Sequence, residues 1–543
     1  MKRPLALVCA TLVAAATLTP LVAPPAQAAP AFDTRPVDAG SAWLVGQLSG
    51  SHLMHNPNFG GFDDYGLSID TEFALATVGG YDATVTQIAD AVAANVDSYT
   101  TYPTSPSNGT HITAGAIAKA VVAAQEASED PTSFGGENLV QELEARVATG
   151  GAIVGRIQDQ WVPGDDFEAD YANVIGQAYA AEGLTAAGST DAAEVTSFLL
   201  EQQCSAGWFR LSFTTDTTAS DQSCDGDATS TPDTDVTALA VLALLPQQGS
   251  NPAAATAITD ATTWLLTQQK TNGSFGGSGP TSAANANSTG VAGWALGEVS
   301  QDAAATKAAT WIRAHQAADE APCTTGLTSS TGAIGYDGAA LTAGRSDGIT
   351  DATSDQWRRA STQALPVLQW AALATGSLGL DGPGGYVKAH STHTFTVSGA
   401  APGERVCVNR ADIGGNAGMA GSARLRVTVG GGTATRTYTA YNSDKTASAT
   451  TDVAILGWAR FDVRLGKERV WRRHLQTVRV PGMAPHEAVT LFLHGRVLKH
   501  GKADAHGVYA TSFRVGRRLG LAAVKVAGQF PSLRYGRALF TVR

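Results

Sequence analysis

The stretch TTWLLTQQKTNGSFGG, residues 262–277, shows the pattern that decides the fold of this chain. An apolar segment of helical periodicity ends at Gln268 and Gln269, a polar turn with glycine follows, and a segment of small residues begins at Asn287. The same order recurs before and after this stretch. One such helix pair cannot bury its apolar face alone, so successive pairs are expected to pack against one another.

Twelve segments follow this pattern, six for each helix of a pair. The predicted first helices contain the segments that begin at Ala42, Ile88, Asn138, Thr196, Thr262 and Ala309. The predicted second helices, rich in small residues, begin at Ile69, His111, Asp170, Asp233, Asn287 and Ser361. Six pairs of similar length predict a closed (α/α)6 toroid with the small-residue helices inside and Trp-bearing helices outside. An open solenoid is the alternative, and it would need polar terminal caps.

The run WLLTQQKTNGSFGG and the STG segment at residues 288–290 resemble the repeat of the squalene cyclase and protein prenyltransferase superfamily. This resemblance covers about residues 29–385 and implies an (α/α)6 toroid. Terpene cyclases, prenyltransferase β-subunits, vitamin B12 carriers and thioester domains share that fold. The fold alone therefore does not choose a function.

After residue 385 the pattern changes to short alternating segments between Gly and Pro turns, which predict antiparallel strands. The segment VSGAAPGERVCV from Val397 matches VPGMAPHEAVTL from Val480, at a separation of 83 residues. This repeat predicts two Ig-like β-sandwiches, over residues 390–470 and 471–543, and resembles β-sandwich domains of bacterial surface proteins. The predicted fold class is thus multidomain, an all-α toroid followed by all-β sandwiches.

Charge divides the chain at the same place. Residues 29–389 carry a net charge of −28, whereas residues 390–543 carry +15. The acidic part makes nucleic acid a poor partner, because phosphate would be repelled. The basic part is expected to bind an anionic envelope polymer or lipid. Alternatively, it packs against the acidic toroid and neutralises part of the negative charge there.

The N-terminus has the composition of an export signal. Lys2 and Arg3 precede an apolar stretch over residues 5–22, and Ala26-Gln27-Ala28 offers a small-residue cleavage site. Residues 1–28 are therefore predicted to be a signal peptide, with a membrane anchor helix as the less favoured alternative. No later segment has the composition of a transmembrane helix, so we expect a secreted, extracellular protein. We also expect it to associate with the cell envelope.

Four cysteines follow the predicted signal peptide, as expected for disulfides in an exported chain. Cys204 and Cys224 bracket one polar loop and are predicted to pair. Cys323 and Cys407 lie on either side of the charge boundary; their pairing stays open, although a bond between them would join the two parts. The spacing fits no zinc site, and no cofactor is expected.

Five polar residues fall at or near the predicted starts of inner helices: Asp70, His111, Asp170, Asp233 and Asp235. Helix N-termini present free N–H groups and partial positive charge, so these residues predict a polar ring around one mouth of the toroid. For each acid taken alone, helix capping is the more ordinary role.

The segment from Asp233 to Ala238 resembles the Asp-x-Asp-Asp-Thr-Ala motif of squalene–hopene cyclases, with Asp235 in the place of the proton donor and Val236 replacing the next acid. The acid pairs Asp63-Asp64 and Asp165-Asp166 are the residues that a glycan hydrolase or lyase would use. Neither set forms a complete catalytic constellation.

The sequence therefore favours a secreted, non-catalytic binding protein of the cell envelope, with the toroid as binding domain and the basic β part as tether. Its partner would be a small molecule or an envelope polymer. The alternative is an extracellular carbohydrate-active enzyme or, less favoured, a terpene cyclase-like enzyme.

Overall fold

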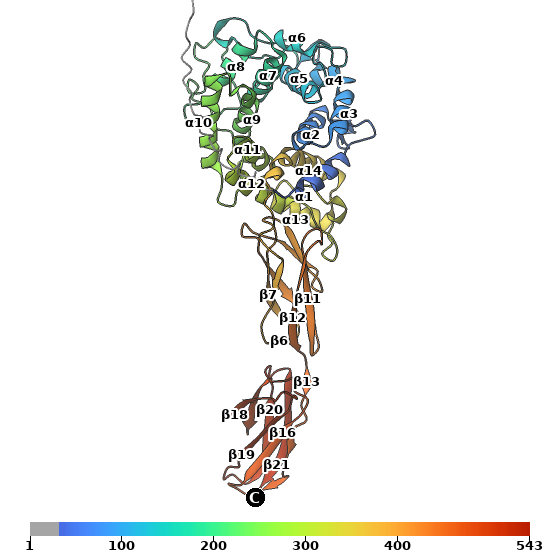
Figure 1. Ribbon diagram of the computed structural model, residues 1–543, viewed down its shortest axis with the longest axis vertical. Coiled ribbons are helices and arrows are strands. Elements are labelled where there is room, and N and C mark those ends of the chain that lie inside the picture. The colour runs from blue at the N-terminus through green and yellow to red at the C-terminus, as the bar shows by residue number, and fades with distance from the viewer. Residues whose placement is uncertain (1–31) are drawn as a thin grey trace, which may run out of the picture. The chain divides into compact units, whose positions relative to one another are not determined.

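The computed structural model describes residues 32–543 (Figure 1). The predicted signal peptide lies outside the described residues. Within them, no helix is long and apolar enough to cross a membrane.

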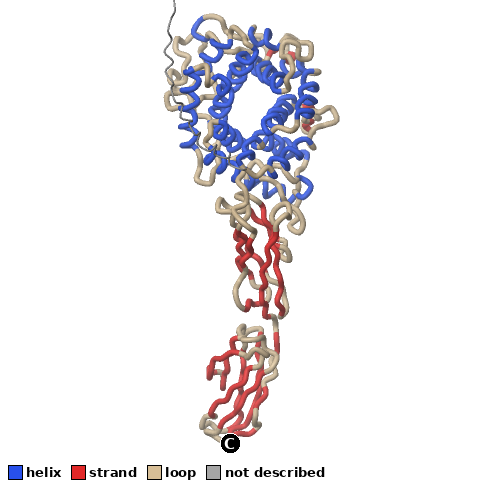
Figure 2. Tube along the Cα trace, in the orientation of Figure 1, coloured by secondary structure: helices blue, strands red, loops and turns tan. Residues whose placement is uncertain are grey.

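Residues 35–364 form two concentric sets of six helices (Figure 2). The inner set is α2 (Tyr65–Val78), α5 (Ala114–Glu126), α7 (Val174–Ala187), α9 (Thr234–Leu244), α11 (Ala286–Glu298) and α14 (Asp351–Ala364). The outer set is α1 (Arg35–Val45), α3 (Asp82–Ala93), α6 (Leu139–Glu144), α8 (Ala192–Glu201), α10 (Pro252–Gln268) and α12 (Asp302–His315). Two further helices, α4 (Val96–Thr100) and α13 (Gly338–Asp347), lie in connections.

The inner helices close a ring. Each one contacts the next in chain order, and α14 contacts α2. The predicted (α/α)6 toroid is therefore confirmed over an open solenoid. Small residues permit this closeness: a Cβ added to Gly176 of α7 would lie 2.9 Å from the Cα of Gly115 in α5, so the two backbones touch.

The sixth inner helix differs from its prediction. It spans Asp351–Ala364, whereas the sequence pattern had placed its start at Ser361. Pro366 stops it, because proline lacks the amide hydrogen and its ring clashes with the preceding turn. A 3-10 segment, Pro366–Trp370, follows and also packs against α11 and α12.

Two β-sandwiches follow the toroid. The first pairs the sheet β10-β7-β5 with the sheet β6-β12-β11-β8-β9, and the second pairs β13-β21-β20-β17-β18 with β14-β16-β19, β15 adding to β21. The strands of the first are β5 (Gly379–Asp381), β6 (Tyr386–Lys388), β7 (Thr392–Ser398), β8 (Arg405–Val408), β9 (Ile413–Asn416), β10 (Ala423–Thr428), β11 (Ala434–Tyr441) and β12 (Ser448–Leu456). Those of the second are β13 (Ala459–Arg460), β14 (Arg464–Leu465), β15 (Arg469–Val470), β16 (Leu475–Val480), β17 (Ala488–Leu493), β18 (Arg496–Lys502), β19 (Tyr509–Arg514), β20 (Gly520–Ala527) and β21 (Arg534–Val542).

The strands extend beyond the predicted boundaries at residues 385, 390 and 470. β5 and β6 precede residue 390, and the core of the second sandwich already includes Phe461. These early strands have two or three residues each, which is too short for an alternating pattern to be visible in the sequence. The toroid, the first sandwich and the second sandwich have separate hydrophobic cores.

The internal repeat has a structural meaning. Glu404 accepts a hydrogen bond from the amide of Ala401 at 2.9 Å, and Glu487 accepts the equivalent bond from Ala484 at 2.9 Å. Both side chains are buried and ion-paired, but with different partners. Glu487 binds Arg534 of its own sandwich at 2.7 Å, whereas the nearest cation to Glu404 is Arg35 of α1, at 3.4 Å.

A covalent bond and buried ion pairs connect the toroid to the first sandwich. Cys323 and Cys407, whose pairing the sequence left open, form a disulfide. Beside it, the fully buried Asp319 lies 2.7 Å from Arg405 of the sandwich and 3.0 Å from Arg345 of α13. Opposite charges on the acidic toroid and the basic sandwich thus attract each other at this contact.

Candidate functional site

The inner helices enclose a cavity of about 300 Å³. Its wall is contributed by α2, α5, α7, α9 and α11 and by the turn after α9. Most of the lining is apolar or aromatic: Phe73, Val122, Ile175, Ala178, Tyr179, Leu239, Leu242, Ala243, Leu245, Pro246 and Trp294. This size and composition are typical of sites for small ligands.

Three carboxylic acids also line the cavity: Glu126 and Glu298, which end α5 and α11, and Glu182 in the C-terminal half of α7. Burial, together with the charge of Glu126, raises the pKa of Glu182 to about 7. Burial likewise raises the pKa of Glu126 above its ordinary range. Glu298 accepts a hydrogen bond from the indole Nε1 of Trp294 at 3.0 Å, which orients both side chains at the cavity wall.

A half-buried ion pair connects α2 and α5, two helices of the cavity wall. Lys119 Nζ lies 2.5 Å from Asp70 Oδ1 and donates to the carbonyl of Gly66 at 2.9 Å. Burial opposes the positive charge, but Asp70 and neighbouring Tyr99 and Tyr179 outweigh it and raise the pKa of Lys119. Asp70 therefore neutralises the charge of Lys119, and the glutamates of the lining give the cavity its acidic character.

Asp70, the first predicted site residue, lies within α2 and not at its start. α2 begins at Tyr65, and Asp64 caps it by accepting a hydrogen bond from the amide of Leu67. Asp70 is held by Lys119 as described above. The capping role that the sequence allowed for Asp70 thus falls to a residue six positions earlier.

His111 lies on the two-stranded sheet of β3 (Thr101–Pro103) and β4 (Thr110–Ile112), before α5. Its Nδ1 is 2.5 Å from Glu168 and its Nε2 is 3.4 Å from Asp159. The ring stacks on Tyr102 at a centroid distance of 4.5 Å. This buried cluster ties together loops that are far apart in the sequence.

Asp170 also belongs to a loop, because α7 begins at Val174 under a cap from Asn173. One carboxylate oxygen of Asp170 pairs with Arg156 at 2.8 Å, and the other accepts from the amide of Asp159 at 3.0 Å. Asp159 contacts His111 as well, so the structure brings Asp170 and His111 into one network.

Asp233 and Asp235 are at the start of α9, as predicted. Asp233 caps the helix by accepting from the amides of Asp235 and Val236, and it accepts from Ser278 Oγ at 2.5 Å. Asp235 is largely buried, which raises its pKa to about 6, and its Oδ1 has no hydrogen-bond partner among the described residues. None of the five predicted residues belongs to the cavity lining given above.

Three of the four acids proposed for glycan chemistry have structural partners. Asp63 contacts His55 at 2.9 Å, and Asp64 contacts Arg359 at 2.5 Å in addition to capping α2. Asp165 accepts from Thr104 and Ser107. Among residues 32–543, no three His, Cys, Asp or Glu side chains are placed to hold a metal ion.

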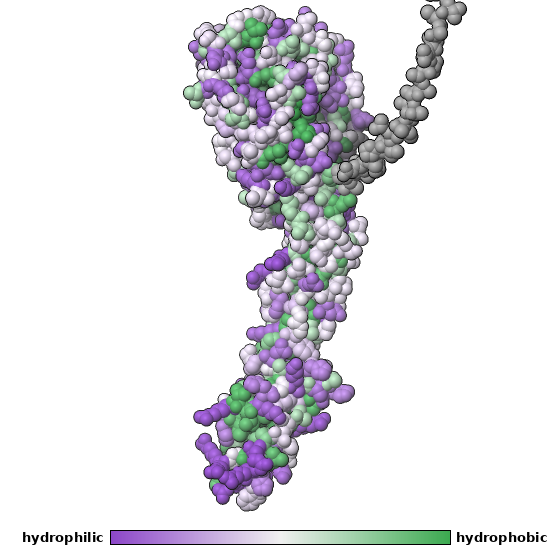
Figure 3. All heavy atoms as spheres, turned by 60° about the vertical axis from the view of Figure 1, so that its left-hand side comes forward, coloured by the Kyte–Doolittle hydropathy of each residue, from purple (hydrophilic) through white to green (hydrophobic). Residues whose placement is uncertain are grey.

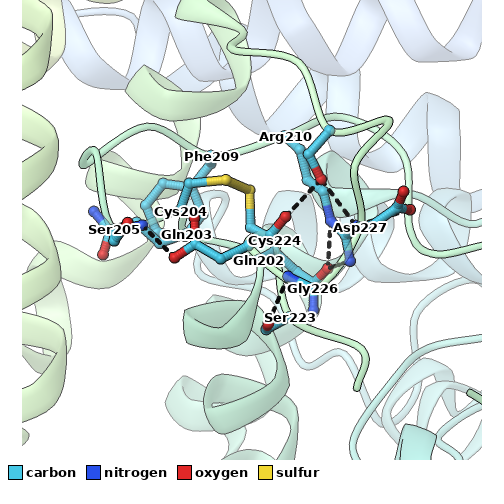
Figure 4. Close-up of a disulfide and its surroundings, with 12 residues drawn as sticks. Gln202, Gln203, Cys204, Ser205, Phe209, Arg210, Ser223, Cys224, Gly226 and Asp227 are labelled. Carbon is cyan, nitrogen blue, oxygen red and sulfur yellow. Dashed lines mark hydrogen bonds and ion pairs between the residues drawn. A yellow bond between two sulfur atoms is a disulfide. The ribbon is translucent and has the colours of Figure 1, made fainter. Parts of the chain in front are cut away.

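The predicted disulfide between Cys204 and Cys224 is confirmed (Figure 4). It closes the long loop between α8 and α9, around the buried guanidinium of Arg210. Arg210 donates to Gln202 Oε1 at 2.7 Å and to the carbonyl of Gln222 at 2.7 Å, and it pairs with Asp227 at 3.3 Å.

Sequence reasoning missed the cavity acids. Their signal was an acidic residue in a helix otherwise made of small apolar residues, with an aromatic residue three or four positions before it in two cases. These cases are Tyr179 with Glu182, and Trp294 with Glu298. The predicted site residues were all sought at helix starts, whereas these acids lie in the C-terminal halves of their helices.

The sequence matches no family model and no curated protein. Among solved structures, the apo type II terpene cyclase MstE from Scytonema is 13% identical, with a TM-score of 0.41 over 62% of this chain and 97% of that chain. A protein from Actinoplanes is 15% identical, with a TM-score of 0.40 over 62% and 99% of the two chains. The Yersinia pseudotuberculosis adhesin InvE is 14% identical, with a TM-score of 0.18 over 31% and 58%. At these identities and TM-scores the similarities carry no conclusion about the fold or the activity of this chain.

Proposed function

We propose that this chain is a secreted, non-catalytic binding protein whose toroid holds a small, largely apolar ligand that carries a positively charged group. The observation that carries the proposal is the cavity, where apolar and aromatic side chains from five inner helices surround Glu126 and Glu182. The basic β part, residues 390–543, would keep the protein at an anionic surface of the cell envelope.

The cavity wall favours this ligand class for electrostatic reasons. Bringing two carboxylates into an apolar wall raises the free energy of their charged forms, which is why their pKa values are raised. A cation between them would offset that cost, and Trp294 and Tyr179 would add cation–π attraction. A sugar would find few hydrogen-bonding groups on this wall.

The cyclase alternative has less support. It needs an acid that faces an aromatic cavity, and the candidate, Asp235, lies outside the lining given above. The glycan alternative has less support as well, since the proposed acids Asp64 and Asp165 are engaged in capping, an ion pair and hydrogen bonds.

Thermal unfolding in the presence of small probes tests the proposal. We expect adamantylamine to raise the melting temperature and adamantane carboxylate to leave it unchanged, because binding to the folded state stabilises it. The stabilisation by the amine should grow as pH rises through about 7, where Glu182 becomes ionised.

Two variants complete this test. Glu182→Gln should weaken the effect of the amine, while Glu194→Gln, on the exposed surface of α8, should not. Ala178→Trp would fill the cavity and should abolish binding. Equal stabilisation by amine and carboxylate, or stabilisation that persists in Ala178→Trp, would contradict the proposal.

A further inference from the structure

The positive charge of the β part is concentrated in the second sandwich. Residues 459–543 contain 17 Lys and Arg against four Asp and Glu, whereas residues 390–458 contain six against four. Figure 3 shows hydrophilic side chains beside hydrophobic ones on this sandwich. Its two ion pairs, Arg464 with Asp462 and Arg534 with Glu487, leave most of the cations without an acidic partner among the described residues.

Six of these cations gather at one end of the sandwich. Backbone hydrogen bonds join the chain terminus to the loop between β15 and β16, from Arg472 to Arg543 at 2.8 Å, and that loop to the end of β19, from Arg473 to Val515 at 3.0 Å. Gly520, at the start of β20, pairs with Val542. The arginines at this end are Arg472, Arg473, Arg514, Arg517, Arg518 and Arg543, and all are exposed.

Large apolar side chains are exposed at the same end. Trp471 is 64% exposed, Leu475 54%, Leu519 59% and Leu521 67%. We call these four residues and the six arginines the basic tip. Glu468 is the acidic residue beside it, joined through its carbonyl to the amide of Thr541.

We infer that the basic tip docks on an anionic phospholipid surface. Arginine guanidinium groups match lipid phosphates in charge and geometry, and clustered basic side chains are attracted to anionic leaflets. Trp and Leu beside them enter the interfacial layer of a bilayer, where tryptophan is preferred. A hydrated wall polymer would neutralise the arginines equally well but would leave the apolar side chains in water, so the lipid surface is the better match.

This inference rests on the tether part of the proposed function and is independent of what the cavity binds. It is tested by sedimentation of the full chain with vesicles of phosphatidylcholine mixed with phosphatidylglycerol, and with pure phosphatidylcholine vesicles. We expect binding to the anionic vesicles alone. Binding should weaken between about 0.1 M and about 1 M salt, as the screening length falls from about 10 Å to about 3 Å.

Matched variants locate the surface. Arg517→Gln with Arg518→Gln should weaken vesicle binding roughly tenfold or more, given the attraction of each arginine to an anionic leaflet. Arg479→Gln with Lys502→Gln removes the same charge from the other end of the strands and should change binding by less than about twofold, because charges beyond a screening length contribute little. Equal losses from both pairs would mean diffuse charge and would overturn the role of the tip.

The apolar residues separate lipid from polymer. Leu519→Ser with Leu521→Ser keeps every charge, and it should remove the binding that persists at high salt. If this variant binds vesicles as the parent does, or if the parent binds soluble polyphosphate but no vesicle, the partner is a polyanion and the inference fails. Adamantylamine binding, measured without vesicles, should be unchanged in all these variants, so a failure here is distinguishable from failure of the cavity proposal.

Discussion

At the scale of a residue, the buried carboxyl group of Glu72 in α2 makes the stability of the folded protein depend on pH. Its side chain is fully buried, and neither oxygen has a hydrogen-bond partner among the described residues. Burial, with smaller contributions from Glu126 and Glu129, raises its pKa from 4.5 to about 9. The folded protein thus keeps the proton over a range in which the unfolded chain has lost it. Stability from this group is present below pH 4.5 and is lost as pH rises toward 9.

Glu72→Gln should therefore stabilise the protein, and the gain should grow with pH. We expect little change near pH 4.5 and a gain on the order of 5 kcal/mol near pH 8 in the free energy of unfolding. Urea unfolding at both pH values measures it, with the exposed Glu194→Gln as control. A gain that is independent of pH would show that Glu72 is ionised in the folded protein.

At the scale of an element, the loop between α8 and α9 has two separate supports, a disulfide and a buried arginine. The disulfide between Cys204 and Cys224 closes a loop with a sequence separation of 20 residues. Loop closure of that size contributes about 3 kcal/mol in the chain-entropy model. Arg210 satisfies buried groups through Gln202 and Gln222, so its loss leaves acceptors unpaired.

We expect Arg210→Met to destabilise the protein by about 2–4 kcal/mol, because an apolar side chain of similar length removes the hydrogen bonds and the pairing with Asp227. Calorimetry of this variant measures the loss of stability without the arginine. Calorimetry of Cys204→Ser/Cys224→Ser measures the loss of stability without the disulfide. The cavity should keep its amine binding in both variants, since neither the arginine nor the cysteines belong to the lining. Loss of that binding in a folded variant would mean that the loop positions α9.

At the scale of the whole molecule, the connections between domains differ. The toroid and the first sandwich share the disulfide between Cys323 and Cys407 and the buried ion pairs of Asp319. The second sandwich has its own core, and its repeat glutamate, Glu487, is paired with its own Arg534. The sequence analysis placed one boundary at residues 385–390, where the charge changes, and another at residue 470.

We expect two thermal transitions, with the toroid and first sandwich unfolding together and the second sandwich unfolding alone. Cys323→Ser with Cys407→Ser should lower the first transition, since closing a loop with a sequence separation of 84 contributes about 4–5 kcal/mol in the chain-entropy model. The second transition should not move. Differential scanning calorimetry measures both, and a shift of the second transition would contradict the independence of the last domain.

Patterns within short stretches of sequence were sufficient to predict the architecture. Helical periodicity, the polar turns with glycine and the repeat at Val397 and Val480 predicted the toroid, the two sandwiches and the loop disulfide, because each depends on residues close in sequence. The pattern failed where an element had two or three residues, as at β5, and where a proline cut an apolar run, as at Pro366.

The sequence by itself determined which segments are helices and strands, since periodicity, caps and turn residues act within a few positions of one another. Tertiary structure alone decided which side chains share a cavity. Glu126, Glu182 and Trp294 lie on three helices that are dozens of residues apart, and only closure of the ring brings them to one wall. The same holds for the pairing of Cys323 with Cys407 and for the arginines of the basic tip, which three separate loops and strand ends bring together. The physical reason is that the charge environment, the burial and the pKa of a side chain depend on its neighbours in space. Those neighbours are fixed only when the helix pairs pack against one another.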